Sequence, residues 1–148
     1  IFLGVSSGGT ITGVSQAIKA HDSKTKVVAV DIVGSVIFGG PPQKRFIPGI
    51  GAGIRGSILD KALIDEVIMV EEIDTIKACK DLIIEQNIFG GGSSGSVYFA
   101  IKEYFRNLDL SFKPKVAMII CDKGERYYDT IYNESWVLEN FGEYNVLH

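Results

Sequence analysis

Two stretches of glycine and hydroxyl residues carry the residue types best suited to chemistry in this sequence. The first runs from Gly4 to Thr10 (Gly-Val-Ser-Ser-Gly-Gly-Thr), after an apolar start and before a helical pattern. Small residues let backbone N–H groups converge on an anion, hydroxyls add donors, and the following helix contributes the positive end of its dipole. The stretch therefore predicts a phosphate-binding loop.

A second stretch of the same character, Gly90 to Ser96, also precedes a helical pattern. Two such loops in one α/β unit suggest a ligand held at both ends. The first loop has neither the Gly-x-x-x-x-Gly-Lys-Ser/Thr spacing of a P-loop nor the Gly-x-Gly-x-x-Gly spacing of dinucleotide sites. Taken alone, it is equally consistent with an ordinary strand-to-helix turn. The pairing of the two loops favours the binding interpretation.

Composition narrows the class of protein. The 148 residues are 46% hydrophobic and 22% charged, which predicts one compact domain. Fifteen basic against eighteen acidic residues give a net charge of −3, which disfavours nucleic acid as a partner. Cys79 and Cys121 have no metal-type spacing and are interpreted as buried apolar residues in a reducing, cytoplasmic compartment. We expect no membrane segment, and the start at Ile1 is interpreted as a strand within a longer protein.

The elements that must position these loops follow from apolar periodicity. Runs rich in β-branched residues predict parallel strands at 26–32, 66–70 and 115–120. Helical periodicity predicts helices over 10–20, 74–86 and 96–108. Because strands and helices alternate, the predicted fold is α/β, a doubly wound parallel sheet with flanking helices.

Two segments fall outside this alternation. Residues 33–57 are rich in glycine and proline but also hold apolar residues, which predicts a long ordered loop that packs near a site. Residues 127–148 contain six aromatic residues, which favours a tail that docks on the domain.

Four motifs carry a family resemblance: residues 6–13, 48–53, 91–95 and 124–127. In this order they resemble the C-terminal half of cysteine synthase and other fold-type II (tryptophan synthase β-like) pyridoxal-phosphate enzymes. The family forms its Schiff base with a lysine in the N-terminal half, so the catalytic lysine is not expected within this sequence. The resemblance therefore implies that residues 1–148 are a C-terminal cofactor-binding portion, inactive alone and completed by an N-terminal portion in a homodimer.

The resemblance also implies residue roles. Ser6, Ser7, Gly8, Gly9 and Thr10 would bind the phosphate of pyridoxal 5'-phosphate. Ser93 would contact the pyridine nitrogen, where a hydroxyl holds the ring less firmly protonated than a carboxylate would.

Further candidates lie around the cofactor ring and the substrate. Gly49 and Ile50 would line its substrate side, with Gly49 also near the cofactor. Asp122 would lie near the ring edge, either against the nitrogen or, as we favour, behind it or in solvent. Arg55 is a candidate for binding a substrate phosphate or carboxylate, although a solvated arginine is an equally good interpretation. No metal site is expected.

The implied activity is β-replacement on an O-activated L-serine through an aminoacrylate. Three further features resemble a siderophore-biosynthesis branch of the family: residues 34–39, residues 127–132 and Trp136. That branch implies O-phospho-L-serine as donor and L-glutamate as nucleophile. The alternatives are O-acetylserine with sulfide, as in cysteine synthase, and a non-catalytic ligand-binding module.

Overall fold

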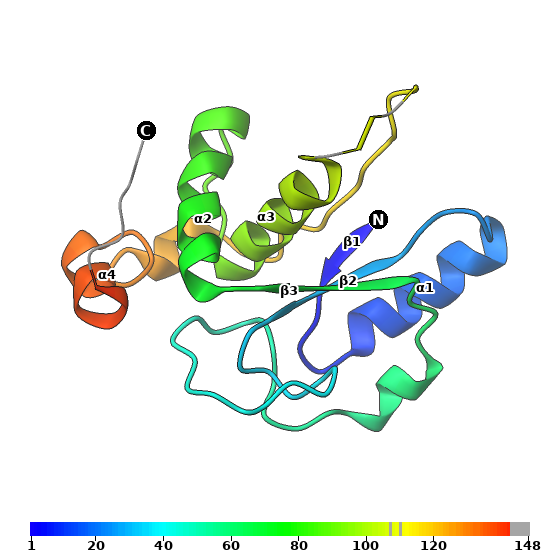
Figure 1. Ribbon diagram of the computed structural model, residues 1–148, viewed down its shortest axis with the longest axis horizontal. Coiled ribbons are helices and arrows are strands. Elements are labelled where there is room, and N and C mark those ends of the chain that lie inside the picture. Colours follow the sequence, from blue (N-terminus) through cyan, green and yellow to red (C-terminus); the bar gives the residue numbers. More distant parts are fainter. Residues whose placement is uncertain (107, 110, 143–148) are drawn as a thin grey trace.

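A three-stranded parallel sheet forms the centre of the computed structural model, which describes residues 1–106, 108–109 and 111–142 (Figure 1). The strands lie in the order β1 (Phe2–Gly4), β2 (Val28–Ile32) and β3 (Glu66–Val70). In the register, Ala29 of β2 pairs with Leu3 on one side and Val67 on the other. All five residues of the central strand are buried, as expected for a parallel strand covered on both faces.

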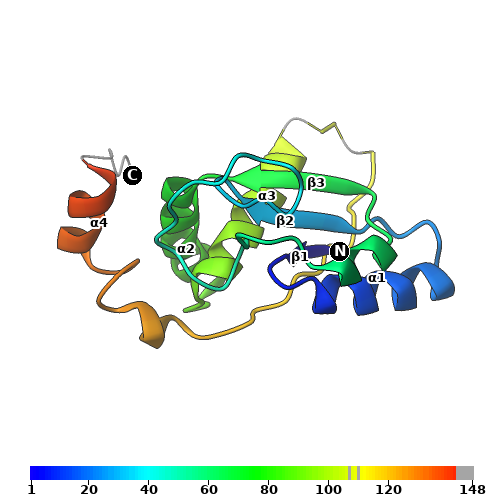
Figure 2. The same cartoon turned by 90° about the horizontal axis from the view of Figure 1, so that it is seen from below.

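Helices cover both faces of this sheet (Figures 1 and 2). Helix α1 (Gly9–His21) lies on one face, and α2 (Glu72–Gln86) and α3 (Gly92–Arg106) lie on the other. Helix α4 (Glu134–Phe141) packs at the far end of the α2 and α3 layer, and short 3₁₀ turns η1 (Ser57–Lys61) and η2 (Gly124–Tyr127) complete the elements. The doubly wound α/β prediction is therefore confirmed.

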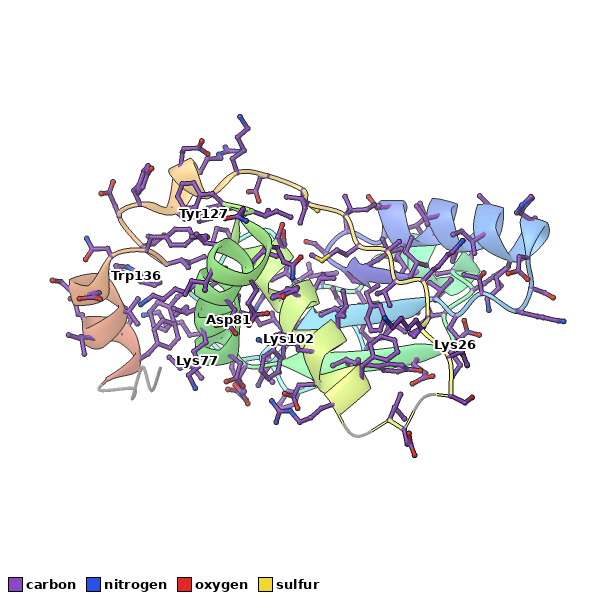
Figure 3. All side chains as sticks on the ribbon, turned by 90° about the horizontal axis from the view of Figure 1, so that it is seen from above. Lys26, Lys77, Asp81, Lys102, Tyr127 and Trp136 are labelled. Atoms are coloured by element: carbon purple, nitrogen blue, oxygen red, sulfur yellow. The ribbon has the colours of Figure 1, made fainter. Side chains whose placement is uncertain are left out.

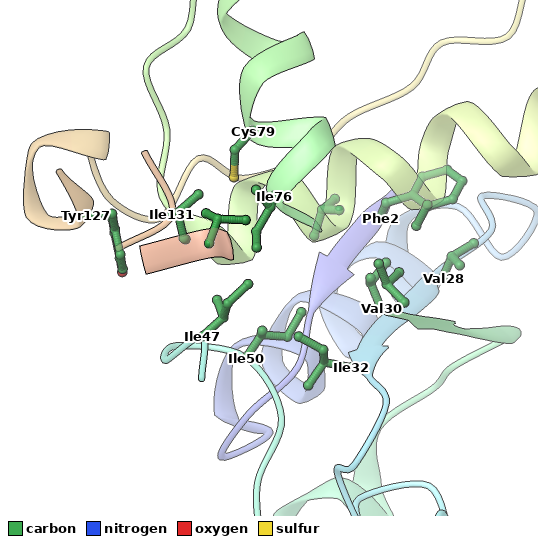
Figure 4. Packing of buried hydrophobic residues seen from close by; sticks show 14 residues of the cluster. Phe2, Val28, Val30, Ile32, Ile47, Ile50, Ile76, Cys79, Tyr127 and Ile131 are labelled. Carbon is green, nitrogen blue, oxygen red and sulfur yellow. The ribbon is translucent and has the colours of Figure 1, made fainter. Parts of the chain in front are cut away.

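The side chains of the strands divide the core into two clusters. Leu3 and Ala29 face α1, where they pack with Ile11. Val28 and Val30 face α2 and α3, where Ile76 and Ile131 join them (Figure 4). Adjacent strand residues thus serve opposite faces, which is the period-2 pattern of a sheet with helices on both sides.

Helix α3 begins earlier than its periodicity predicts, at Gly92 instead of Ser96. Most of the second glycine-rich stretch is therefore the first turn of a helix and not a loop. The reason is helix–helix packing, because a Cβ on Gly95 would lie 2.3 Å from Sγ of Cys79 and 2.8 Å from the carbonyl oxygen of Thr75. The hydroxyls of Thr75 and Ser96 meet across the same contact at 2.7 Å. Small residues here let α2 and α3 approach closely.

Two lysines on the helices form ion pairs with acidic residues of neighbouring elements. Lys102 of α3 donates to Asp81 and Glu85 of α2, at 2.8 and 2.7 Å (Figure 3). Lys19 of α1 pairs with Asp65, just before β3, at 2.7 Å. These pairs tie neighbouring elements together.

The predicted strand over 115–120 is wrong as a full strand. Within this segment, Met118 forms an isolated parallel bridge with Phe2, and the N–H of Phe2 donates to the carbonyl of Ala117 at 2.9 Å. Its neighbour β1 is only three residues long, so a longer ladder has no partner there. Cys121, which follows the segment, is exposed, whereas Cys79 is buried. This corrects the expectation that both cysteines are buried.

The long loop and the C-terminal tail behave as predicted where the structure describes them. Residues 33–56 form no helix or strand, yet Ile37, Ile47 and Ile50 are at most 2% exposed. In the tail, Ile131 and Val137 are buried in the core cluster. The last expected tail residues, 143–148, lie outside the described residues. Within the described part of the chain, no helix is both long enough and apolar enough to cross a membrane.

Candidate functional site

The first glycine-rich stretch lines a cavity of about 130 Å³ at the C-terminal end of β1. The lining residues come from the strand end, the N-terminus of α1, the long loop and the 115–121 segment: Gly4, Val5, Ser6, Ser7, Gly8, Thr10, Ile11, Gly49 and Cys121. In open α/β sheets, ligands bind outside the carboxyl ends of the strands. The first-turn N–H groups of α1 have no acceptor within the helix and can point to an anion.

Glycine at position 8 is a structural requirement of this cavity. Gly8 caps α1 with a φ of 91°, in the left-handed region. A Cβ at this position would also lie 2.4 Å from Cγ of Leu59, in η1. Both the conformation and the contact exclude a larger residue, so Gly8 sets the geometry of the turn.

The five predicted phosphate ligands differ in what they offer. Ser7 and Thr10 line the cavity and are exposed, so their hydroxyls are open to a ligand. Ser6 also lines it, but its hydroxyl donates to the carbonyl of Gly51 at 3.1 Å. Gly9 begins α1 beside the cavity without being one of its lining residues.

Ser93 lies close to this cavity although it is far away in the sequence. It is in the first turn of α3 and is 7% exposed. A Cβ on Gly4 would lie 3.9 Å from the carbonyl oxygen of Ser93 and 3.6 Å from Cδ1 of Ile50. The two glycine-rich stretches therefore meet at the end of β1, with Ile50 beside them.

Asp122 lies behind the N-terminus of α3. Its Oδ2 accepts the hydroxyl of Tyr127 at 2.5 Å, and its Oδ1 is buried without a hydrogen-bond partner. A Cβ on Gly91 would lie 2.1 Å from that Oδ1, so the carboxylate packs directly against the glycine. Burial and the bond to Asp122 raise the pKa of Tyr127 to about 12, so Tyr127 remains a donor at neutral pH.

A second cavity, of about 340 Å³, adjoins the first. It is lined by Gln43, Arg45, Phe46, Ile47, Pro48, Gly49, Ile50 and Gly51. Gly49 lines both cavities and is itself exposed, with a φ of 89°. Ile50 is 1% exposed and directs its side chain into the core (Figure 4). The segment predicted to face the substrate thus lies next to the phosphate-type cavity.

Arg55 is not among the residues that line either cavity. Its guanidinium pairs with Asp60 at 2.5 Å on the exposed surface, and its neighbour Ile54 is 83% exposed. A role in substrate binding would require Arg55 to exchange Asp60 for the substrate, and it stays a prediction.

Four residues of this region were not predicted as site residues: Arg45, Glu72, Cys121 and Tyr127. Tyr127 lies in one of the motifs, so its neighbourhood was available from the sequence. Glu72 and Arg45 act on backbone groups of the long loop, and no local pattern signals such contacts.

Small residues, open hydroxyls and a helix N-terminus around one cavity fit a phosphate monoester. No cluster of histidine, cysteine or acidic residues suited to a metal ion occurs among residues 1–106, 108–109 and 111–142. The fold and the geometry of the site are those expected of an α/β protein that binds a phosphorylated ligand at the ends of its parallel strands.

A family comparison specifies this class further. Residues 1–122 match the pyridoxal-phosphate dependent enzyme family, and the chain belongs to that family, in its fold-type II branch.

Two curated relatives are similar over most of the chain. Both are N-(2-amino-2-carboxyethyl)-L-glutamate synthases, one from Cupriavidus metallidurans and one from Ralstonia nicotianae. Each is 40% identical over 138 residues, which cover 93% of this chain and 40% of the relative. The chain thus spans less than half of the length of these proteins.

A solved structure shows the same fold. The O-acetylserine dependent cystathionine β-synthase of Helicobacter pylori superposes with a TM-score of 0.79 at 25% identity, over 89% of this chain and 43% of that one. Its likeness agrees with the fold-type II architecture expected from the four motifs.

Proposed function

We propose that this chain is the cofactor-binding C-terminal portion of an enzyme that replaces the β-substituent of an O-activated L-serine. The first-choice donor is O-phospho-L-serine and the first-choice nucleophile is L-glutamate. The observation that carries the proposal is the 40% identity over 93% of the chain to two synthases of N-(2-amino-2-carboxyethyl)-L-glutamate. The cavity at the N-terminus of α1 agrees with it, since this cavity suits the phosphate of pyridoxal phosphate.

The reaction balances without an oxidant or reductant. The amine of glutamate forms a bond to Cβ of the serine, the Cβ–O bond breaks, and phosphate leaves with its electron pair. The proton lost from the amine passes to solvent or to the leaving phosphate. When bound, pyridoxal phosphate withdraws electrons from the Cα of the amino acid, which makes the departure of a β-substituent possible.

The described residues would bind and orient the reactants. Ser7, Thr10 and the N-terminus of α1 would hold the cofactor phosphate. Ser93 would meet the ring nitrogen with a hydroxyl, and Gly49 would let the substrate approach the backbone closely. Asp122, held by Tyr127, would stand behind this contact.

The partners and the setting are proposed from the family resemblance of the sequence. We propose a homodimer in the cytoplasm, with the N-terminal portion of the same enzyme supplying the Schiff-base lysine. The product would serve siderophore biosynthesis.

A second candidate differs in its donor and nucleophile. The Helicobacter pylori neighbour is described as O-acetylserine dependent, which favours O-acetylserine as an alternative donor, with sulfide as nucleophile as in cysteine synthase. A non-catalytic ligand-binding module remains the alternative from another class.

One assay of the complete protein separates these functions. Each donor, O-phospho-L-serine or O-acetylserine, is paired with L-glutamate or sulfide, and products are identified by mass spectrometry. We expect the glutamate adduct and inorganic phosphate from the first pair. Efficient cysteine formation without a glutamate adduct would overturn the first choice. A complete protein that shows no visible absorption band with pyridoxal phosphate would favour the non-catalytic module.

A further inference from the structure

The segment of residues 43–51 connects the two cavities of the site. It supplies the lining of the second cavity, and through Gly49 it also lines the cavity at the N-terminus of α1. It contains no helix or strand, so the ladder bonds of regular structure do not hold it in place. Its position therefore depends on individual contacts with neighbouring elements.

The strongest polar contact comes from Glu72, the first residue of α2. One carboxylate oxygen of Glu72, Oε1, accepts the N–H of Phe46 at 2.7 Å and the N–H of Ile47 at 2.6 Å. Glu72 is only 9% exposed and Ile47 is 2% exposed, so water has little access to replace this acceptor. Hydrogen bonds to an ionised acceptor in such a setting are stronger than neutral ones, and an orphaned buried N–H is costly.

The residues held by Glu72 lie directly against the site. A Cβ on Gly92 would lie 2.4 Å from Cγ2 of Ile47, so Ile47 packs on the residue that precedes Ser93. Two residues after Ile47 stands Gly49, which lines both cavities. The side chain of Ile47 points into the core beside Ile131 (Figure 4). Glu72 thus acts on Ser93 and on Gly49 through a single residue.

Aromatic packing covers the other held residue. The ring of Phe46 lies 6.2 Å from that of Trp136 and 5.4 Å from that of Phe141, in edge-on geometry, and both of these partners belong to α4. Phe46 is therefore fixed by its backbone to α2 and by its side chain to α4. The opposite end of the segment is tied at Gly51, whose N–H donates to the carbonyl of Val5 at 2.7 Å.

We propose that Glu72 is a positioning residue of the active site, which holds the 43–51 segment against the cofactor loops so that the substrate is bound in a productive place. This inference rests on the proposed function. Glu72 lines neither cavity, and it acts through Phe46 and Ile47. Its loss should therefore weaken substrate binding more than cofactor binding or the chemical step.

The test uses the complete enzyme with pyridoxal phosphate, as parent, Glu72→Ala, Glu72→Gln and the control Glu71→Ala. Glu71 is the adjacent, exposed residue, so the control removes the same charge from the same helix end without touching the segment. The first measurement is the rate of tryptic cleavage at the Arg45–Phe46 bond, whose N–H is the one bound by Glu72. Because cleavage follows local opening, we expect a rate at least about tenfold higher in Glu72→Ala.

The second measurement is the kinetics with whichever activated serine the parent enzyme turns over. For Glu72→Ala we expect a KM raised at least about tenfold, kcat changed by less than about threefold, and an unchanged visible spectrum of the bound cofactor. Glu72→Gln keeps an oxygen acceptor without the charge, so it should lie between the parent and alanine variants. Glu71→Ala should match the parent.

Tryptic cleavage needs no substrate, so it separates this inference from the proposed function. Suppose that Glu72→Ala is cleaved faster and the parent protein turns over no activated serine. This result would refute the proposed function and would still support the role of Glu72 in holding the 43–51 segment. Unchanged cleavage and unchanged KM in Glu72→Ala would overturn the inference. If the alanine variant does not fold, a glutamine variant with parental cleavage and KM would overturn it equally.

Discussion

Single residues decide the shape of the phosphate-type cavity, and Gly8 is the clearest case. Its φ of 91° and the 2.4 Å approach of a Cβ to Leu59 both require glycine. Gly13, one helical turn later in α1, has no atom within 4 Å of where a Cβ would lie. Position 8 therefore requires glycine, whereas position 13 has room for a larger side chain.

Replacing Gly8 with alanine should damage cofactor binding. The left-handed backbone and the clash with Leu59 together cost about 1–3 kcal/mol, and part of this strain is relieved by moving the turn. We expect the dissociation constant for pyridoxal phosphate in the complete enzyme to rise at least about tenfold, measured by absorbance titration. Gly13→Ala is the control: a helix-interior glycine replaced by alanine should gain about 1 kcal/mol and leave the affinity as it is. Equal affinities in parent and Gly8→Ala would refute this account of the cavity.

The two cysteines should differ sharply in reactivity. Burial raises the pKa of Cys79 to about 12, so its thiolate is scarce at neutral pH, whereas Cys121 is exposed and lines the cavity. We expect iodoacetamide at pH 8 to alkylate Cys121 and leave Cys79 intact, as read by peptide mass spectrometry. The added group should reduce binding of pyridoxal phosphate, and prior loading with the cofactor should slow the reaction. Preferential labelling of Cys79 would contradict the burial described here.

At this scale the sequence predicted the loops better than the contacts between them. Residues 4–10 and Ser93 lie near one another as expected, because both belong to glycine-rich stretches at helix starts. Glu72 and Cys121 could not be predicted, since their neighbours are brought together by the fold and lie far away in sequence. The roles expected for these residues in binding the cofactor phosphate, the cofactor ring and the substrate stay predictions, which the assays above test.

Ion pairs connect neighbouring elements of the fold. On the α1 face, the pair between Lys19 and Asp65 is partly buried, with side-chain exposures of 16% and 33%. Lys19 lies in α1, and Asp65 stands just before β3. Oδ2 of Asp65, which lies 2.7 Å from Nζ of Lys19, also accepts the N–H of Val27 at 2.7 Å, next to β2. One carboxylate therefore connects a helix and the N-terminal ends of two strands.

Asp65→Asn should destabilise the protein at neutral pH and not in acid. The hydrogen bond from Lys19 is the main reason that the pKa of Asp65 lies below its ordinary value of 3.8. A lowered carboxyl pKa contributes stability that is complete above 3.8 and lost as the pH falls through the folded-state pKa. In urea denaturation we expect a loss of about 0.5–1 kcal/mol at pH 7 that shrinks towards zero near about pH 2. As a control, Asp60→Asn breaks only an exposed ion pair and should change the free energy of unfolding little. If the loss of stability in Asp65→Asn grew as the pH fell, the predicted pH dependence would be wrong.

The alternation of strands and helices was predictable because the apolar residues of each segment repeat with the period of its own secondary structure. Helix α1 and strand β3 have nearly the predicted bounds. Helix α3 departs from its prediction because glycine and serine at 92–96 resemble a loop in isolation, whereas contact with α2 makes them helical. The 115–120 strand departs for the opposite reason: its residues have strand character, but pairing depends on a neighbour that the local sequence does not specify.

For the whole molecule, the 115–120 segment is a place where apolar side chains are exposed along an extended backbone. Val116, Ile119 and Ile120 are 40%, 40% and 39% exposed. An extended segment with exposed apolar side chains and few ladder bonds is a template for association. This chain covers 40% of the length of the curated relatives. Under the proposed function, the N-terminal portion of the complete enzyme would be available to cover such a surface.

The 148-residue chain expressed alone should therefore associate through this segment. In sedimentation velocity at about 100 μM protein, we expect dimers or larger species that Ile119→Lys reduces, because a charge on the apolar strip opposes edge pairing. Ile84→Lys is the control, since Ile84 of α2 is 78% exposed and belongs to a helix surface without free backbone groups. It should leave the association of the chain unchanged. A parent chain that is monomeric, or an Ile84 variant that dissociates as fully as the Ile119 variant, would show that the exposed segment does not drive association.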